Sequence, residues 1–263
     1  GDLIVRGNVA LSDVVAAGAT RTINITTGNI SVLGVVSGAA GSNLIKAGGG
    51  NLVLSGANTY QGFTQVGAGF LFYGGDVKPN VPGPLGVSDS PVVMAGGSLR
   101  SMGKLSFDRD LIVNNSGTFD TATWDATVVN GGVSLTTTQT LTVGAVAAEV
   151  TTFRGGLLQF NGAISGGGAL TIGTTAAAPA IGGTVYMAGT SNGFGINTYS
   201  GGTTIQSARV QLSGSSYFAG PADNPTTILS GPLGVGTITI GGGESNRGAI
   251  FEAVGGPVTL VNP

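Results

Sequence analysis

The 263-residue sequence contains no cysteine and no histidine. The absence of cysteine excludes disulfides and thiolate metal sites. The absence of histidine removes the side chain that most often serves as a general base or as an imidazole ligand to a metal. The sequence therefore predicts no catalytic residue, no cofactor, no metal site and no enzymatic activity.

Charge is also scarce, because only 8% of the residues are charged, against about 25% in a typical soluble domain. The net charge is −2 and the basic residues stand singly from Arg6 to Arg247. No basic stripe could neutralise a run of phosphates, so we expect no nucleic-acid partner. Apolar runs fall far short of the roughly 18 residues of a membrane helix, so we expect no membrane-spanning segment in this chain.

Helical periodicity is hard to find, whereas short runs rich in Val, Ile, Leu and Thr, bounded by Gly, Asn, Ser and Pro, occur throughout. Such runs are typical of β-strands. We expect strands at residues 2–5, 22–26, 51–54, 70–73, 111–113, 138–143, 209–212 and 237–240. The sequence therefore predicts an all-β fold.

Glycine is abundant, at 50 residues, and it recurs in motifs that keep their order along the chain. Asn58-Thr59-Tyr60 is echoed by Asn197-Thr198-Tyr199, and Gly-Pro-Leu-Gly at 83–86 is echoed at 231–234. The first pair of motifs is 139 residues apart and the second pair 148. We interpret this as two imperfect super-repeats, approximately 1–107 and 108–263, with motif copies at 45–100 and 184–251. Loop insertions at 191–195 and 215–225 would account for the different offsets.

Each super-repeat divides into strand and turn units of roughly 20 to 25 residues, the range typical of solenoids. The preferred interpretation is one continuous parallel β-helix over residues 1–263, with on the order of 11 to 13 coils. An antiparallel sandwich or barrel would also show many short strands. A sandwich does not require an ordered long-period echo, which favours the solenoid.

Residues 50–71, Gly-Asn-Leu-Val-Leu-Ser-Gly-Ala-Asn-Thr-Tyr followed by Gln-Gly-Phe-Thr-Gln-Val-Gly-Ala-Gly-Phe-Leu, resemble the autotransporter-associated β-strand repeat, also called the passenger-associated transport repeat. Residues 197–205 look like a second copy, with extra residues in the approach to it. The resemblance implies a right-handed parallel β-helix outside a bacterial cell or on its outer surface, without enzymatic activity in the repeat. A C-terminal membrane barrel is also a feature of autotransporters, and nothing in the sequence resembles one.

Three sets of residues deserve a functional interpretation beside a structural one. The densest acidic cluster consists of Asp108, Asp110, Asp120 and Asp125, near Arg109 and Trp124. It could act on polysaccharides, as carboxylates on β-helical lyases and hydrolases do, or it could be a solvated turn, which we favour. Tyr60 and Tyr199 could stack on sugars but fit a structural role better. Asn58 and Asn197 fit amide ladders or turn caps.

Both ends of the sequence start or stop on a strand pattern without a polar cap. We therefore expect the coils to stack on copies of the chain or on further repeats of one long chain. The leading hypothesis is a structural cell-surface stalk, fibre or filament. Alternatives are an adhesin that binds glycans or a host protein through Tyr217-Phe218 and residues 221–225, and a polysaccharide-active enzyme.

Overall fold

The computed structural model describes residues 1–11, 19–122, 125–145, 147–149, 154–173, 183–189, 195–206, 208–219, 227–241 and 249–262. Trp124 and residues 191–194 and 221–225, which the sequence had singled out, lie outside these ranges, and so do the side-chain contacts of Phe218. Every regular element of the described chain is a β-strand. No helix capable of crossing a membrane occurs in this part of the chain.

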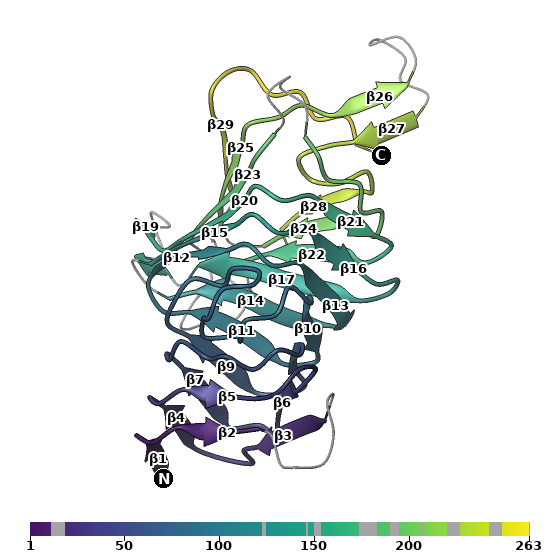
Figure 1. Ribbon diagram of the computed structural model, residues 1–263. Helices are drawn as coiled ribbons and strands as arrows, with labels where there is room; N and C mark the ends of the chain where they lie inside the picture. Colours follow the sequence, from purple (N-terminus) through teal and green to yellow (C-terminus); the bar gives the residue numbers. More distant parts are fainter. Residues whose placement is uncertain are drawn as a thin grey trace.

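Within the described residues, parallel strands form three long sheets that wind around a common axis (Figure 1). The ten-stranded sheet contains β1 (Asp2–Val5), β4 (Asn29–Val32), β7 (Asn51–Leu54), β9 (Phe70–Tyr73), β11 (Ser98–Ser101), β14 (Gly117–Thr121), β17 (Thr140–Ala145), β22 (Ala169–Ile172), β24 (Thr203–Ile205) and β28 (Ile238–Ile240). The seven-stranded sheet contains β3 (Thr20–Asn24), β6 (Asn43–Ala47), β8 (Thr64–Val66), β10 (Val92–Ala95), β13 (Leu111–Asn115), β16 (Val133–Leu135) and β21 (Ile164–Gly166).

The third long sheet has six strands: β12 (Lys104–Phe107), β15 (Ala126–Val129), β20 (Leu157–Phe160), β23 (Thr184–Met187), β25 (Arg209–Leu212) and β29 (Ile250–Ala253). A short parallel pair, β2 (Val9–Ala10) and β5 (Val36–Ser37), occupies the same place in the earlier turns. Two antiparallel pairs depart from the coil: β18 (Ala147–Glu149) with β19 (Arg154–Gly155), and β26 (Tyr217–Ala219) with β27 (Thr227–Ser230).

The core is a set of inward columns in which one turn stacks on the next. Leu52, Leu71 and Leu99 are paired in register on β7, β9 and β11, and all three are fully buried. Strand burial alternates between inward and half-exposed positions, as expected when one face of each strand faces the core. The prediction of an all-β parallel β-helix is confirmed.

The turns are less regular than the sequence suggested. Paired residues in adjacent turns are 19 residues apart from Leu52 to Leu71, but 35 apart from Thr204 to Thr239. Ten strands of one sheet mark the turns of the described chain, fewer than the 11 to 13 coils expected. The expected 20 to 25 residues per coil was therefore too narrow, because long excursions interrupt several turns.

Most predicted strands are present, and their limits differ by a few residues. Residues 2–5, 51–54, 70–73 and 209–212 match β1, β7, β9 and β25. The strand predicted to start at residue 138 instead starts at Thr140. Thr138 has a φ of 70°, which belongs to the left-handed region and cannot continue a strand.

The two repeat copies occupy different faces of the solenoid. In the first copy, β7, β8 and β9 lie in the ten-stranded, seven-stranded and ten-stranded sheets. Their counterparts β23, β24 and β25 lie in the six-stranded, ten-stranded and six-stranded sheets. The second copy is therefore rotated by one face around the axis. The boundary between super-repeats near residue 107 stays a prediction.

Candidate functional site

Both copies contain the same buried asparagine bridge. The Asn58 side chain accepts a hydrogen bond from the Val36 amide at 2.7 Å and donates one to the Pro84 carbonyl at 2.7 Å. Asn197 accepts from the Ile164 amide at 2.8 Å and donates to the Pro232 carbonyl at 2.8 Å. Each side chain thus joins the preceding turn to the Gly-Pro-Leu-Gly loop. They serve as caps, and the amide-ladder alternative does not apply to them.

The repeated tyrosines lie beside these bridges. Tyr60 and Tyr199 are fully buried. The Tyr60 hydroxyl bonds to Thr64 Oγ1 at 2.6 Å, and the hydroxyl of Thr64 donates to the Leu85 carbonyl at 3.1 Å. In the second copy, Tyr199 bonds to Thr203, which donates to the Leu233 carbonyl at 2.8 Å. Such burial excludes sugar stacking on either ring, so these tyrosines are structural.

The Gly-Pro-Leu-Gly motif ends on a glycine that the tyrosine requires. Gly86 and Gly234 have φ values of 81° and 74°, in the left-handed region where a side chain is strained. A Cβ at Gly86 would lie 2.7 Å from the Tyr60 carbonyl oxygen, and one at Gly234 would lie 2.6 Å from that of Tyr199. The distant echoes in the sequence are therefore parts of one contact set. We call Asn58, Tyr60 and Thr64 the first clamp, and Asn197, Tyr199 and Thr203 the second clamp.

Each clamp lies where one face of the solenoid is interrupted. The first follows β5, and the long sheet on that face begins again only at β12. The second follows β21, the last strand of the seven-stranded sheet. At both places the chain then makes an excursion, which bridges back antiparallel through Asn58 to Gly83 or through Asn197 to Gly231. The clamps thus hold the base of a loop where a strand is missing.

The acidic cluster does not form a catalytic cleft. Asp108 accepts a hydrogen bond from Asn130, Asp110 accepts one from the Gly132 amide, and Asp120 binds Arg100. Asp125 precedes β15, and the described residues contain no group of three or more carboxylates able to hold a metal ion. The four carboxylates are engaged separately, in agreement with the solvated-turn interpretation for Asp108 and Asp110. Asp120 is the exception, because it is buried.

Asp120 and Arg100 form an ion pair that the sequence analysis missed. Arg100 Nε and Nη2 donate to the two Asp120 oxygens at 2.5 and 2.6 Å. The guanidinium lies 4.9 Å from the centre of the Phe70 ring and 5.8 Å from that of Phe72. Desolvation raises the pKa of Asp120, and the bonds from Arg100 oppose that rise. The pairing depends on a 20-residue register between β11 and β14, which composition does not reveal.

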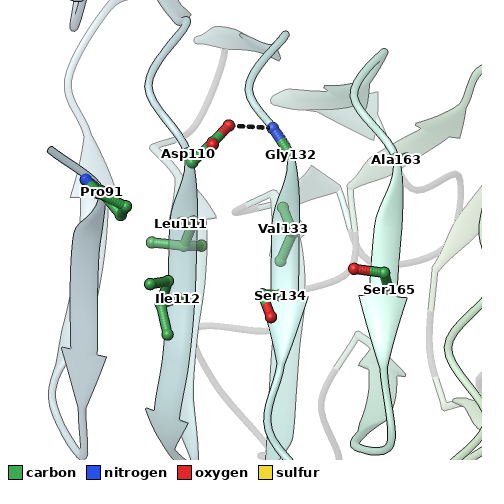
Figure 2. Close-up of a pocket in the computed structure, with 9 residues that line it drawn as sticks. All are labelled: Pro91, Asp110, Leu111, Ile112, Gly132, Val133, Ser134, Ala163 and Ser165. Carbon is green, nitrogen blue, oxygen red and sulfur yellow. Dashed lines mark hydrogen bonds between the residues drawn. The ribbon is translucent and has the colours of Figure 1, made fainter. Parts of the chain in front are cut away.

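A shallow groove of about 340 Å³ lies on the outer surface of the seven-stranded sheet (Figure 2). Its lining is Pro91, Asp110, Leu111, Ile112, Gly132, Val133, Ser134, Ala163 and Ser165. Asp110 accepts the Gly132 amide across the groove at 2.8 Å, as the dashed line in Figure 2 marks. Ile112, Ser134 and Ser165 follow one another in register on adjacent strands. The lining offers a single carboxylate and two hydroxyls, too little for a general acid and base pair.

Amide ladders do occur, at other positions than those expected. Asn29 donates to Asp2 and Asn51 donates to Asn29, at 2.8 and 2.7 Å. A second ladder runs from Asn161 to Asn130 to Asp108, at 2.9 and 2.6 Å. Each ladder starts on an aspartate, which only accepts, and continues through asparagines, which both accept and donate. Their spacing of about one turn was the sequence signal that could have identified them.

Comparison with known proteins agrees with this geometry. The profile of the passenger-associated-transport-repeat family matches residues 44–71 and 182–212. Both segments are passenger-associated transport repeats. They include β7 to β9 and β23 to β25, together with both clamps. The predicted resemblance is confirmed.

A relative supports the same assignment. The chain is 31% identical over 134 residues to "Adhesin BmaC autotransporter" of Brucella suis biovar 1 (strain 1330). The match covers 50% of this chain but 4% of the adhesin's length. No solved structure matches the chain. The chain is an extracellular autotransporter passenger region at the outer surface of a bacterial cell, and its family is one of passenger repeats rather than of enzymes.

Replacing Asn58 by alanine should destabilise the first clamp. The change leaves the buried Val36 amide and Pro84 carbonyl without this partner, at roughly 1 to 3 kcal/mol for each group. Denaturant unfolding would measure the loss. Asn161→Ala is the matched control, because that side chain is exposed and should cost under about 1 kcal/mol. Equal effects of the two changes would contradict the clamp.

The buried tyrosines predict loss of stability at alkaline pH. Burial raises the pKa of Tyr60, Tyr73 and Tyr199 above the ordinary value of 10.0. A raised folded-state pKa means that the fold favours the protonated phenol, so this stability is complete below about pH 10 and falls as the pH rises further. Circular dichroism and phenolate absorbance should therefore change together for these three residues. Ionisation of all three before any loss of β-structure would contradict the prediction.

Proposed function

We propose that the chain is a structural rod segment of the passenger, a stalk or fibre element whose function is mechanical. The supporting observation is the continuity of backbone ladders through the three long sheets, around columns of buried apolar side chains. Stacked repeats of this kind gain stability from nearest-neighbour interfaces. Such a rod spans distance at about 4.8 Å per turn.

End-to-end stacking of coils is part of this proposal. Leu3 and Ile240 occupy inward columns, in register with Ile30 and Ile205, yet they are 54% and 61% exposed. Phe251, in register with buried Val210, is 37% exposed. These side chains stand where a further turn would cover them, whether from the same long chain or from another copy. Their burial would supply roughly 1.5 to 3 kcal/mol for each large side chain.

Sedimentation velocity of the 263-residue chain tests the stacking. We expect association that grows with concentration, and we expect Ile240→Lys to weaken it by placing a charge in the stacking column. Val81→Lys is the control, because Val81 is 47% exposed on the loop between β9 and β10 and does not belong to an inward column. A monodisperse monomer at all concentrations would overturn the stacking proposal.

Adhesion is a second candidate function, favoured by the hairpin of β26 and β27. The hairpin stands away from the coil near the end that carries β28 and β29 (Figure 1). Tyr217 and Leu229 on this hairpin are 48% and 46% exposed. Exposed aromatic and apolar side chains are typical of contact surfaces. The relative named as an adhesin is consistent with this candidate.

Binding of the chain to a glycan array and to immobilised host extracellular-matrix proteins tests adhesion. If the hairpin is the contact surface, the double variant Tyr217→Ala and Leu229→Ser should reduce binding at least about tenfold, the loss expected of a contact worth 1.4 kcal/mol or more. Val81→Ser, on the other excursion, should leave it unchanged. Absence of binding by the parent chain, or equal binding by the double variant, would reject this candidate.

A further inference from the structure

Two short segments outside the matched repeats lie across the excursions that follow the clamps. We call residues 106–109 the first strap and residues 259–262 the second strap. Their sequences, Ser-Phe-Asp-Arg and Thr-Leu-Val-Asn, share no residue. Both come from the turn that follows the excursion they contact. Their similarity is therefore visible only in the contacts they make.

The first strap holds the excursion at residues 74–91 in two places. At its start, the Val77 amide donates to the Ser106 carbonyl at 2.9 Å, and the Asp108 amide donates to the Val77 carbonyl at 2.8 Å. At its end, the Arg109 guanidinium donates to the Leu85 carbonyl at 2.6 Å and, through Nε, to the Ser90 carbonyl at 2.9 Å. Arg109 is 1% exposed. A buried cation is thus spent on holding the backbone of a loop.

The second strap repeats this arrangement with different side chains. The Ser216 amide donates to the Thr259 carbonyl at 2.9 Å, and the Val261 amide donates to Ser216 Oγ at 3.1 Å. Val77 and Ser216 each lie seven residues after the first residue of β9 or β25. Asn262 Nδ2 then donates to the carbonyls of Gly234 and Gly236, at 3.3 and 2.8 Å. Asn262 therefore stands where Arg109 stands in the first copy.

We infer that each strap is a latch that closes the excursion of the preceding turn, with Arg109 and Asn262 as its positioning residues. The clamp holds the base of the loop from within the repeat, whereas the strap holds its far side from the next turn. An excursion is therefore fully fastened only when the following turn is folded onto it. The structural unit of the repeat extends through that turn, to residue 109 in the first copy and residue 262 in the second.

Hydrogen exchange of the full 263-residue chain tests the latch. The amides to follow are Gly86, bonded to the Gly83 carbonyl, and Val87, bonded to the Tyr60 carbonyl. In Arg109→Met they should exchange about 10- to 100-fold faster, since the charge-assisted bonds to the loop are lost. Arg100→Met is the matched control. It removes a cation from a neighbouring strand without touching the loop, so Gly86 and Val87 should keep their protection.

The second strap provides an independent measurement. Asn262→Ala should accelerate exchange at Gly234 and Val235, whose amides donate to Gly231 and Tyr199, and leave Gly86 and Val87 unchanged. If Arg109→Met does not fold, Arg109→Lys keeps the cation with fewer donors and should give a smaller acceleration. Unchanged exchange in the loops, or equal acceleration in all three sheets, would overturn the latch.

Discussion

The structure depends on one constraint, which is that the backbone groups of every turn are satisfied by the turns before and after it. Where three strands occupy all three faces, parallel ladders meet this requirement without any particular side chain. Where a face loses its strand, a side chain has to replace the ladder. Asn58 and Asn197 do so, because a carboxamide can accept from one turn and donate to the next in the way a peptide group does. The motif that defines the repeat is thus found where the regular coil is broken.

The rotation of the second copy by one face follows from the same constraint. A strand in a parallel stack has equivalent neighbours on any of the three faces, so a repeat can begin on any face that the preceding chain reaches. The first clamp interrupts the face that β5 and β12 share, and the second interrupts the face of β21. Excursions held by successive clamps therefore point away from different sides of the rod. A family of such repeats can place loops around a stalk while the core columns continue undisturbed.

Much of the fold could be predicted from the sequence, because strands and corners are local. The run from Asn51 to Leu54 and the positive-φ glycines at 86 and 234 have recognisable patterns wherever they occur. The pairing of Asn58 with Pro84 was implied only as a shared order of motifs. Arg109 and the Arg100 to Asp120 pair were beyond reach, since their partners are set by the length of each turn. Turn lengths from 19 to 35 residues cannot be derived from local periodicity.

The few charges in the sequence take on a different meaning in the folded chain. Arg109 is buried against carbonyls, Asp120 is buried against Arg100, and buried Lys46 donates to the carbonyls of Ala47, Gly48 and Ala68 at 2.7 to 2.9 Å. Burial of a charge is costly unless it is paired or hydrogen-bonded, so each of these residues sits where several oxygens or an opposite charge converge. In this solenoid such convergence arises at corners, at excursions and between registered strands. A chain that spends its scarce ionic groups on holding the coil together has few left on its surface for chemistry, which is consistent with a mechanical role.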